Sequence, residues 1–199
     1  MLKFLAKAIP FGGLLTFMGL LVGCGVQSLP QTNNEVEAAF AEVMNQYKRR
    51  ADLIPNLVET VKGYAQQEKE TLTAVVEARA KATSIQIDPT KATPEQLAQF
   101  SAAQGQLSQA LGRLLMVSEQ YPDLKSNQNF RDLQSQLEGT ENRITVARNR
   151  YIESVQKFNN LVTVFPTSIT NSIFFKFEKK PQWGADLPQT IQEPPKVGF

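Results

Sequence analysis

The chain has 199 residues, which suits one domain, and its 42% hydrophobic and 20% charged residues are typical of a globular protein. The formal net charge is only +2, so we expect no nucleic-acid partner, because nucleic-acid binding normally requires a clustered basic excess. The chain has no histidine and one cysteine. This composition excludes an intrachain disulfide, a Cys/His metal site and every Ser/His or Cys/His nucleophile pair. We therefore expect no catalytic residues, no metal and no cofactor.

The first 23 residues have the pattern of a lipoprotein signal peptide. Lys3 and Lys7 precede an uncharged, mostly apolar stretch at 9–22, which is shorter than the roughly 20 residues of a membrane span. This stretch ends in Leu21, Val22, Gly23 and Cys24, a run that resembles a lipobox. The resemblance implies cleavage before Cys24 and acylation of that residue, which would bind the chain to membrane lipid. The alternative is that residues 9–22 remain as an uncleaved anchor.

This signal predicts a location in the bacterial cell envelope, with the protein anchored to a membrane and facing the periplasm or the exterior. Gly25 follows the cysteine, where an aspartate would suggest inner-membrane retention, so the outer membrane is favoured if the source is Gram-negative. Residues 24–34 are short, polar and contain Pro30. We expect them to form a flexible tether.

Apolar residues recur at a mixed three–four spacing from residue 35 to about 83, which predicts a long amphipathic helix. Pro55 is its one interruption, and we expect a kink or a break near residues 52–54. Residues 85–93 follow as a loop. Thr93, Pro94 and Gln96 then predict a helix start with a capping box, and Pro122 ends this second helix. The third helix is expected to begin after a cap at Asn127 and to carry its apolar stripe to Phe165 before Pro166.

Three such helices with short connections can bury their stripes only against one another. The predicted class is therefore all-α, an up-and-down antiparallel bundle of three long helices over residues 35–166. The count becomes four if the first helix breaks at Pro55.

Several blocks of this sequence are distinctive: KRRADLIPNLV at 48–58, EARA at 77–80, YPDLKSN at 121–127, ENRI at 141–144 and FP at 165–166. Together they resemble the LemA family over about residues 35–180. The resemblance implies a membrane-anchored bacterial helical bundle outside the cytoplasm, with no agreed biochemical activity. Relatives are linked to envelope homeostasis, membrane remodelling and companion membrane proteases. The family's usual anchor is an N-terminal transmembrane helix, for which this chain carries the lipobox.

Two groups of polar residues form a candidate polar network or partner site. They are Arg49, Arg50, Asp52 and Asn56 around Pro55, and Glu141, Asn142, Arg143 and Arg148 in the third helix. Arg50, Glu68 and Glu141 fall on or beside positions of the apolar stripe. One interpretation is a pocket that binds a ligand or a partner group. We favour the other, an ion-pair network between Arg50 or Arg49 and Glu141 that fixes helix register.

An enzyme acting on envelope material would need acid–base groups, for which Glu138 and Glu141 are candidates because they lie three residues apart on one helical face. Nothing in the sequence places a nucleophile or a metal beside them, so we disfavour this function.

Residues 167–199 form an aromatic and basic tail. Its candidate membrane or partner patch consists of Phe174, Phe175, Phe177, Lys179, Lys180 and Trp183. The alternative is that the aromatic residues fold back over one end of the bundle. We expect residues 186–199 to be disordered because of their composition.

These observations predict a membrane-tethered envelope lipoprotein that acts as a non-catalytic interaction or scaffolding module, with an envelope protein as its partner. A homo-oligomer is left open. The alternative is an oligomeric structural protein that shapes membranes.

Overall fold

The computed structural model describes residues 11–183, with side chains from residue 27 onward. The helices are α1 (Phe11–Tyr64), α2 (Lys69–Ser84), α3 (Pro94–Ser118), α4 (Pro122–Ser126), α5 (Gln128–Thr163) and α6 (Thr167–Thr170), followed by the π-helix η1 (Asn171–Phe175). No strand occurs among these residues, so the predicted all-α class is confirmed. None of the helices in the described part of the chain has a stretch long and apolar enough to cross a membrane.

The chain divides into two compact units. The bundle unit consists of Glu37–Glu153 and Pro181–Phe199, and the small unit consists of Met1–Val36 and Ser154–Lys180. Helices α1 and α5 each contribute residues to both units. The expected division into a tether, a bundle at 35–166 and a separate tail at 167–199 therefore differs from the observed one.

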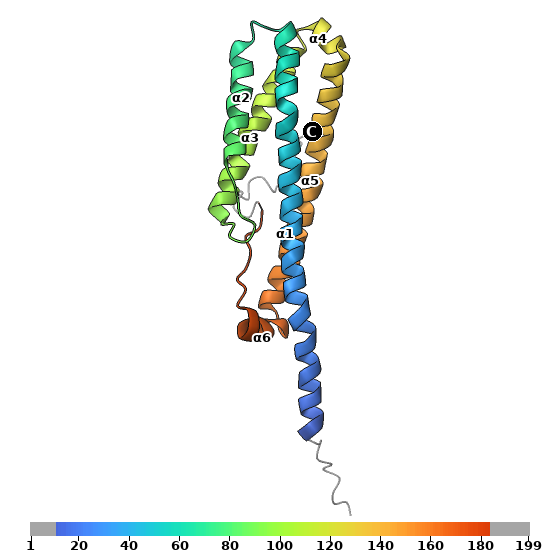
Figure 1. Ribbon diagram of the computed structural model, residues 1–199, viewed down its shortest axis with the longest axis vertical. Helices are drawn as coiled ribbons and strands as arrows, with labels where there is room; N and C mark the ends of the chain where they lie inside the picture. The colour runs from blue at the N-terminus through green and yellow to red at the C-terminus, as the bar shows by residue number, and fades with distance from the viewer. Residues whose placement is uncertain (1–10, 184–199) are drawn as a thin grey trace, which may run out of the picture. The chain divides into compact units, whose positions relative to one another are not determined.

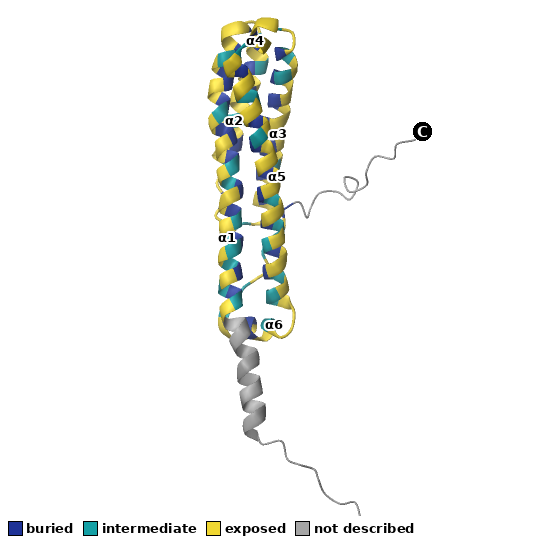
Figure 2. Cartoon of the chain, turned by 90° about the vertical axis from the view of Figure 1, so that its right-hand side faces the viewer, coloured by how far each residue is buried: buried dark blue, intermediate teal, exposed yellow. Residues whose placement is uncertain are grey.

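The bundle unit packs α2, α3 and the bundle segments of α1 and α5 side by side, with each helix running opposite to the one before it (Figure 1). The buried faces of these helices point toward one another (Figure 2). The core is apolar, and its fully buried side chains include Ile54, Leu57, Val61, Leu107, Leu114 and Leu124. The up-and-down antiparallel arrangement is as predicted, but the long helices number four rather than three.

The additional helix arises from a turn between Tyr64 and Lys69 and not from a break at Pro55. The Glu68 amide donates to the carbonyl of Ala65 at 3.1 Å, which closes this turn. The pattern did not reveal it because Val61, Ala65, Leu72 and Val75 are all buried and keep their helical spacing across the turn.

Pro55 lies inside α1, which continues through it as one helix, so the predicted break near residues 52–54 does not occur. A residue with an amide at position 55 would donate to the carbonyl of Ala51, four residues earlier, but proline has no amide proton. Arg79 of α2 donates to this carbonyl from its Nε atom at 2.7 Å. A side chain from a neighbouring helix thus replaces the missing backbone hydrogen bond.

The predicted starts of the later helices are confirmed. The Thr93 side chain accepts from the Gln96 amide at 3.2 Å, and the Gln96 side chain accepts from the Thr93 amide at 3.1 Å, which completes the capping box. Asn127 accepts from the Phe130 amide at 3.1 Å and so caps α5. Pro122 does not follow directly on α3 but begins the short helix α4.

Residues 24–34 were expected to form a flexible tether, but they lie within α1. Within the small unit, Leu29 and Thr32 are buried, and they extend the three–four spacing toward Val36. The Thr32 hydroxyl donates to the carbonyl of Ser28 at 2.8 Å, which satisfies this buried polar group inside the helix. The side chains of the lipobox residues Leu21, Val22, Gly23 and Cys24 lie outside the described residues, as do residues 1–10 and 184–199. The expected disorder of residues 186–199 therefore falls outside the described part of the chain.

Candidate functional site

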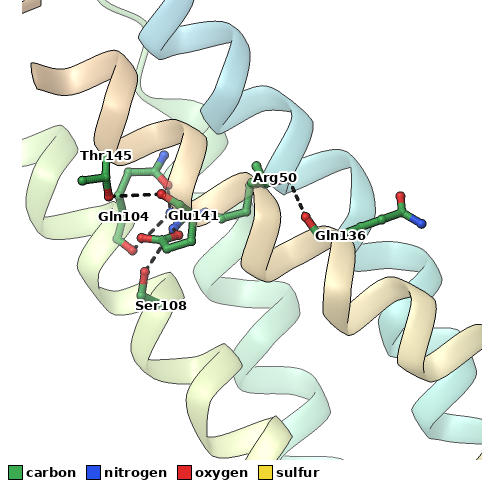
Figure 3. Close-up of polar contacts among 7 residues, drawn as sticks. Arg50, Gln104, Ser108, Gln136, Glu141 and Thr145 are labelled. Carbon is green, nitrogen blue, oxygen red and sulfur yellow. Dashed lines mark hydrogen bonds and ion pairs between the residues drawn. The ribbon is translucent and has the colours of Figure 1, made fainter. Parts of the chain in front are cut away.

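Arg50 is the centre of a polar network inside the bundle unit (Figure 3). It comes from the buried face of α1, and only 2% of its surface is exposed. Its Nη1 atom lies 2.7 Å from Oε2 of Glu141 on α5 and 3.1 Å from Oγ of Ser108 on α3. Its Nη2 atom donates to the side-chain oxygen of Gln104. The guanidinium also lies over the Tyr47 ring, 5.2 Å from the ring centroid.

This geometry joins three helices through one charge. The Gln104 amide donates to the carbonyl of Ala82 at 3.5 Å, which extends the network to the end of α2. Glu141 has a half-exposed side chain, so the pair is buried on the arginine side only. The Arg50–Glu141 pair that the structural interpretation expected is present, and it matches the role of an interhelical contact that fixes register.

The other members of the two polar groups do not join this network. Arg49, Asp52 and Asn56 are exposed on α1. Asn142 and Arg143 are exposed on α5 and line a shallow hollow of about 280 Å³. Only Asp52 among these residues borders the large cleft described below. The eight residues of the candidate site therefore do not lie together in one site.

The two carboxylates considered for acid–base chemistry have separate environments. Glu141 binds Arg50, whereas Glu138 is exposed and accepts from Gln134 at 3.1 Å. Glu68, the remaining acidic residue beside the stripe, accepts from the Tyr121 hydroxyl at 2.9 Å.

A cleft of about 680 Å³ lies beside the Arg50 network, between α1, the end of α2, the 85–93 loop and α3. Its lining is mostly apolar and includes Phe40, Met44, Ile85, Ile87 and Phe100. The lining also carries three charged residues, which are Lys48 and Asp52, one helical turn apart on α1, and Arg79 of α2. A cleft of this size and composition suits a small apolar ligand or a few apolar side chains of a partner. The sequence contained no direct signal for it, because the loop residues Ile85 and Ile87 do not belong to a helical stripe.

Trp183 does not belong to an exposed patch, contrary to the sequence prediction. Only 4% of its surface is exposed, because it packs inside the bundle unit. Its ring stacks on Tyr47 at a centroid distance of 6.1 Å and meets Phe100 and Tyr151 edge to face. The guanidinium carbon of Arg148 lies over the Trp183 ring, 5.3 Å from the ring centroid. Arg148, expected in the polar network, thus contacts this aromatic cluster instead.

Burial changes the acid–base behaviour of two tyrosines in this aromatic cluster. It raises the pKa of Tyr151 from 10.0 to about 12, because the charged form loses its hydration. Burial also raises the pKa of Tyr47, and the nearby Arg148 and Arg50 partly oppose that rise. The Tyr151 hydroxyl donates to the carbonyl of Pro181 at 3.2 Å.

The rest of the predicted patch lies in the small unit. Phe174 is exposed, as are Lys176 and Lys179, whereas Phe175 and Phe177 are partly buried and stack on each other at 5.5 Å. Phe177 also meets Phe158 at 5.7 Å, and Lys180 lies over the Phe158 ring. Phe165 was expected on the buried stripe of the third helix, but it is 70% exposed because α5 ends at Thr163.

A model of the LemA family matches residues 39–199 of this sequence. The chain belongs to the LemA family. The resemblance noted in the sequence is thereby confirmed, over a range that extends beyond the expected limit near residue 180.

Individual relatives agree with this membership. A segment of 140 residues is 26% identical to Protein LemA of Metamycoplasma hominis and covers 70% of this chain and 60% of that protein. The LemA family protein described here thus spans less than two thirds of that curated relative. Segments of 98 residues are 33% identical to Magnetosome protein MamQ 2 of Paramagnetospirillum magneticum and 32% identical to Magnetosome protein MamQ of Magnetospirillum gryphiswaldense. Each covers 46% of this chain and 36% of the relative.

Proposed function

We propose that this LemA family protein is a lipid-anchored, non-catalytic interaction module of the bacterial cell envelope. Acylated Cys24 is its anchor, and the bundle unit binds apolar side chains of an envelope protein partner. It faces the periplasm or the exterior, on the outer membrane in a Gram-negative cell. The observation that carries the binding role is the cleft of about 680 Å³ between α1, α2, the 85–93 loop and α3.

Two properties of the cleft support a binding role. Its walls are mostly apolar side chains, whose removal from water is the main favourable term in association. Its lining residues Gln104 and Arg79 are held by hydrogen bonds, because Gln104 accepts from Arg50 and Arg79 donates to the Ala51 carbonyl. A preformed cleft loses little conformational entropy on binding.

The anchor is tested by the intact mass and membrane partitioning of the native protein beside a Cys24→Ser variant. We expect the wild-type mass to match cleavage before Cys24 with added acyl chains, and the variant to lack them. An uncleaved, unacylated wild type that still partitions into membranes contradicts the lipoprotein proposal and returns residues 9–22 as the anchor.

The partner site is tested by photocrosslinking in native membranes. A benzophenone amino acid at Ala41, which is exposed and lines the cleft, should give a crosslinked adduct, and the same group at the exposed Met116 of α3 should not. Thr83→Trp adds a bulky ring inside the cleft and should abolish the adduct, whereas Ala80→Trp, on an exposed position of α2 outside the cleft, should leave it.

An adduct that survives Thr83→Trp at full yield contradicts binding in the cleft. Adducts that contain only further copies of this chain favour the alternative of an oligomeric, membrane-shaping protein.

A further inference from the structure

A short segment at the end of the small unit exposes several large apolar side chains. Five apolar side chains between residues 164 and 174 are half or more exposed, and we call them the apolar patch: Val164, Phe165, Ile169, Ile173 and Phe174. In the same stretch the polar residues Thr170 and Asn171 are buried. Large apolar side chains grouped in so short an exposed segment are typical of a surface that contacts a membrane or another protein.

The side chains of Thr167 and Asn171 are hydrogen-bonded to nearby backbone atoms. The Thr167 hydroxyl bonds to the Leu161 and Val164 carbonyls at 2.6 and 3.0 Å. The Asn171 side chain exchanges two hydrogen bonds with the Phe177 backbone, both at 2.9 Å. Because these two side chains have partners within the chain, they can enter a less polar medium without leaving their hydrogen-bonding groups unpaired.

The charge around the apolar patch favours an anionic surface. Residues 164–180 contain three lysines, Lys176, Lys179 and Lys180, and one acidic residue, Glu178. Lys176 and Lys179 are exposed directly after η1. Lysines beside exposed aromatic residues are the combination that binds the headgroup region of anionic bilayers.

The patch also lies close to the proposed anchor. Helix α6 lies beside the part of α1 that belongs to the small unit (Figures 1 and 2). Within the same unit, Glu35 of α1 is paired with Lys157 of α5 at 2.8 Å. The backbone of α1 continues from the buried Leu29 to Cys24, a rise of about 8 Å along the helix axis.

We propose that the apolar patch inserts into the interface of an anionic phospholipid bilayer, with Lys176 and Lys179 at the headgroups. This inference rests on the proposed function only in placing the chain at a membrane, and it holds whether the anchor is acylated Cys24 or residues 9–22. The patch is then a second membrane contact beside the anchor.

The full chain is reconstituted into vesicles of phosphatidylethanolamine and phosphatidylglycerol, with and without brominated acyl chains. Phe174→Trp places a fluorescent reporter in the patch, and Met116→Trp places one at an exposed position of α3 as the matched control. Trp183 is buried and is the chain's only tryptophan. Its fluorescence is measured in the unsubstituted protein and subtracted. We expect the residue 174 reporter to lose at least half of its emission to brominated lipid and to resist aqueous iodide, with the control showing the opposite.

Three outcomes overturn the proposal. Quenching of the residue 174 reporter by iodide but not by bromolipid means that the patch faces water. Protection from both quenchers means that a protein, either a partner or a second copy, covers it. A chain that does not float with the vesicles has no membrane contact of any kind.

The role of the lysines is tested separately. Lys176→Glu with Lys179→Glu should reduce bromolipid quenching in these vesicles, and Lys69→Glu with Lys91→Glu, both exposed in the bundle unit, should not. If the residue 174 reporter is quenched by bromolipid in a chain that is not acylated, only the lipoprotein proposal is contradicted. If the chain is acylated and the reporter is not quenched, only the patch proposal is contradicted.

Discussion

The Nε atom of Arg79 lies 2.7 Å from the carbonyl oxygen of Ala51, so a side chain of α2 makes the hydrogen bond that Pro55 cannot make within α1. Ala51 is buried, and a buried carbonyl without a partner destabilises the folded state. We expect Arg79→Met to lower the free energy of unfolding by about 1–3 kcal/mol. Urea unfolding followed by circular dichroism measures this change, and Arg113→Met on α3 is the control for loss of an exposed arginine.

Pro55→Ala separates this hydrogen bond from other contributions of Arg79. In a Pro55→Ala background the new amide can donate to the Ala51 carbonyl, so Arg79→Met should cost much less there than in the wild type. Equal costs in both backgrounds would show that Arg79 stabilises the bundle for another reason.

Glu141 should contribute more to stability than Glu138, although both are acidic residues of α5. Removing the Glu141 carboxylate leaves the buried Arg50 charge with neutral partners only. We expect Glu141→Ala to cost about 1–3 kcal/mol, below the full value for a buried pair because Glu141 is half exposed. Glu138→Ala should change stability by less than about 0.5 kcal/mol. Indistinguishable urea midpoints for the two variants would argue against a register-fixing role of the pair.

Truncation of Trp183 should destabilise the fold, whereas truncation of Phe174 should not. Trp183 is buried among three aromatic rings, and Trp183→Ala should lower the free energy of unfolding by about 3–5 kcal/mol. Phe174 is 60% exposed, and Phe174→Ala should leave stability nearly unchanged. Thermal unfolding by circular dichroism compares the two variants. A large loss of stability in Phe174→Ala, without one in Trp183→Ala, would show that the Phe174 ring is packed in the interior.

Tyr151 should make stability depend on pH in the alkaline range. Its pKa is about 12 in the folded chain against 10.0 for an ordinary tyrosine, so the folded state holds the proton more tightly. The associated stability is therefore complete below pH 10 and is lost as the pH rises toward about 12. Tyr151→Phe should flatten this decline in the urea midpoint, and a decline of unchanged steepness would assign it to other groups.

The sequence predicted those parts of the fold that depend on local chemistry. Thr93 with Gln96, and Asn127, have side chains that bond to amides three residues away, so the starts of α3 and α5 could be located from neighbouring residues alone. The apolar spacing was sufficient for the all-α class and the antiparallel packing. The turn at 65–68 was missed because hydrophobic spacing continues across it without a proline.

The candidate site was predicted only in part, because its other members depend on tertiary contacts. The Arg50–Glu141 pair could be expected since a charge on an apolar stripe needs a partner. The lysines before Trp183 favour a candidate surface patch, with folding back on the bundle as the alternative, and the choice between them depends on contacts with α1, α3 and α5 that lie far away in the sequence. The helical period of the third helix predicts that Phe165 is buried. Because α5 ends at Thr163, this period no longer determines where the Phe165 side chain points.

The contact between the Tyr151 hydroxyl and the Pro181 carbonyl joins two residues that are 30 positions apart. The chain between them, including the apolar patch, is thus a closed loop whose two ends belong to the bundle unit. Closing a loop of this length costs about 3 kcal/mol of chain entropy, which is comparable to what the burial of Trp183 supplies. If the Trp183 contacts open, the two hydrogen bonds between the Asn159 side chain and the Lys180 backbone, at 2.8 and 2.9 Å, and the contacts with the Phe158 ring still close this loop, and proteases should cleave within residues 164–180 before the bundle itself unfolds.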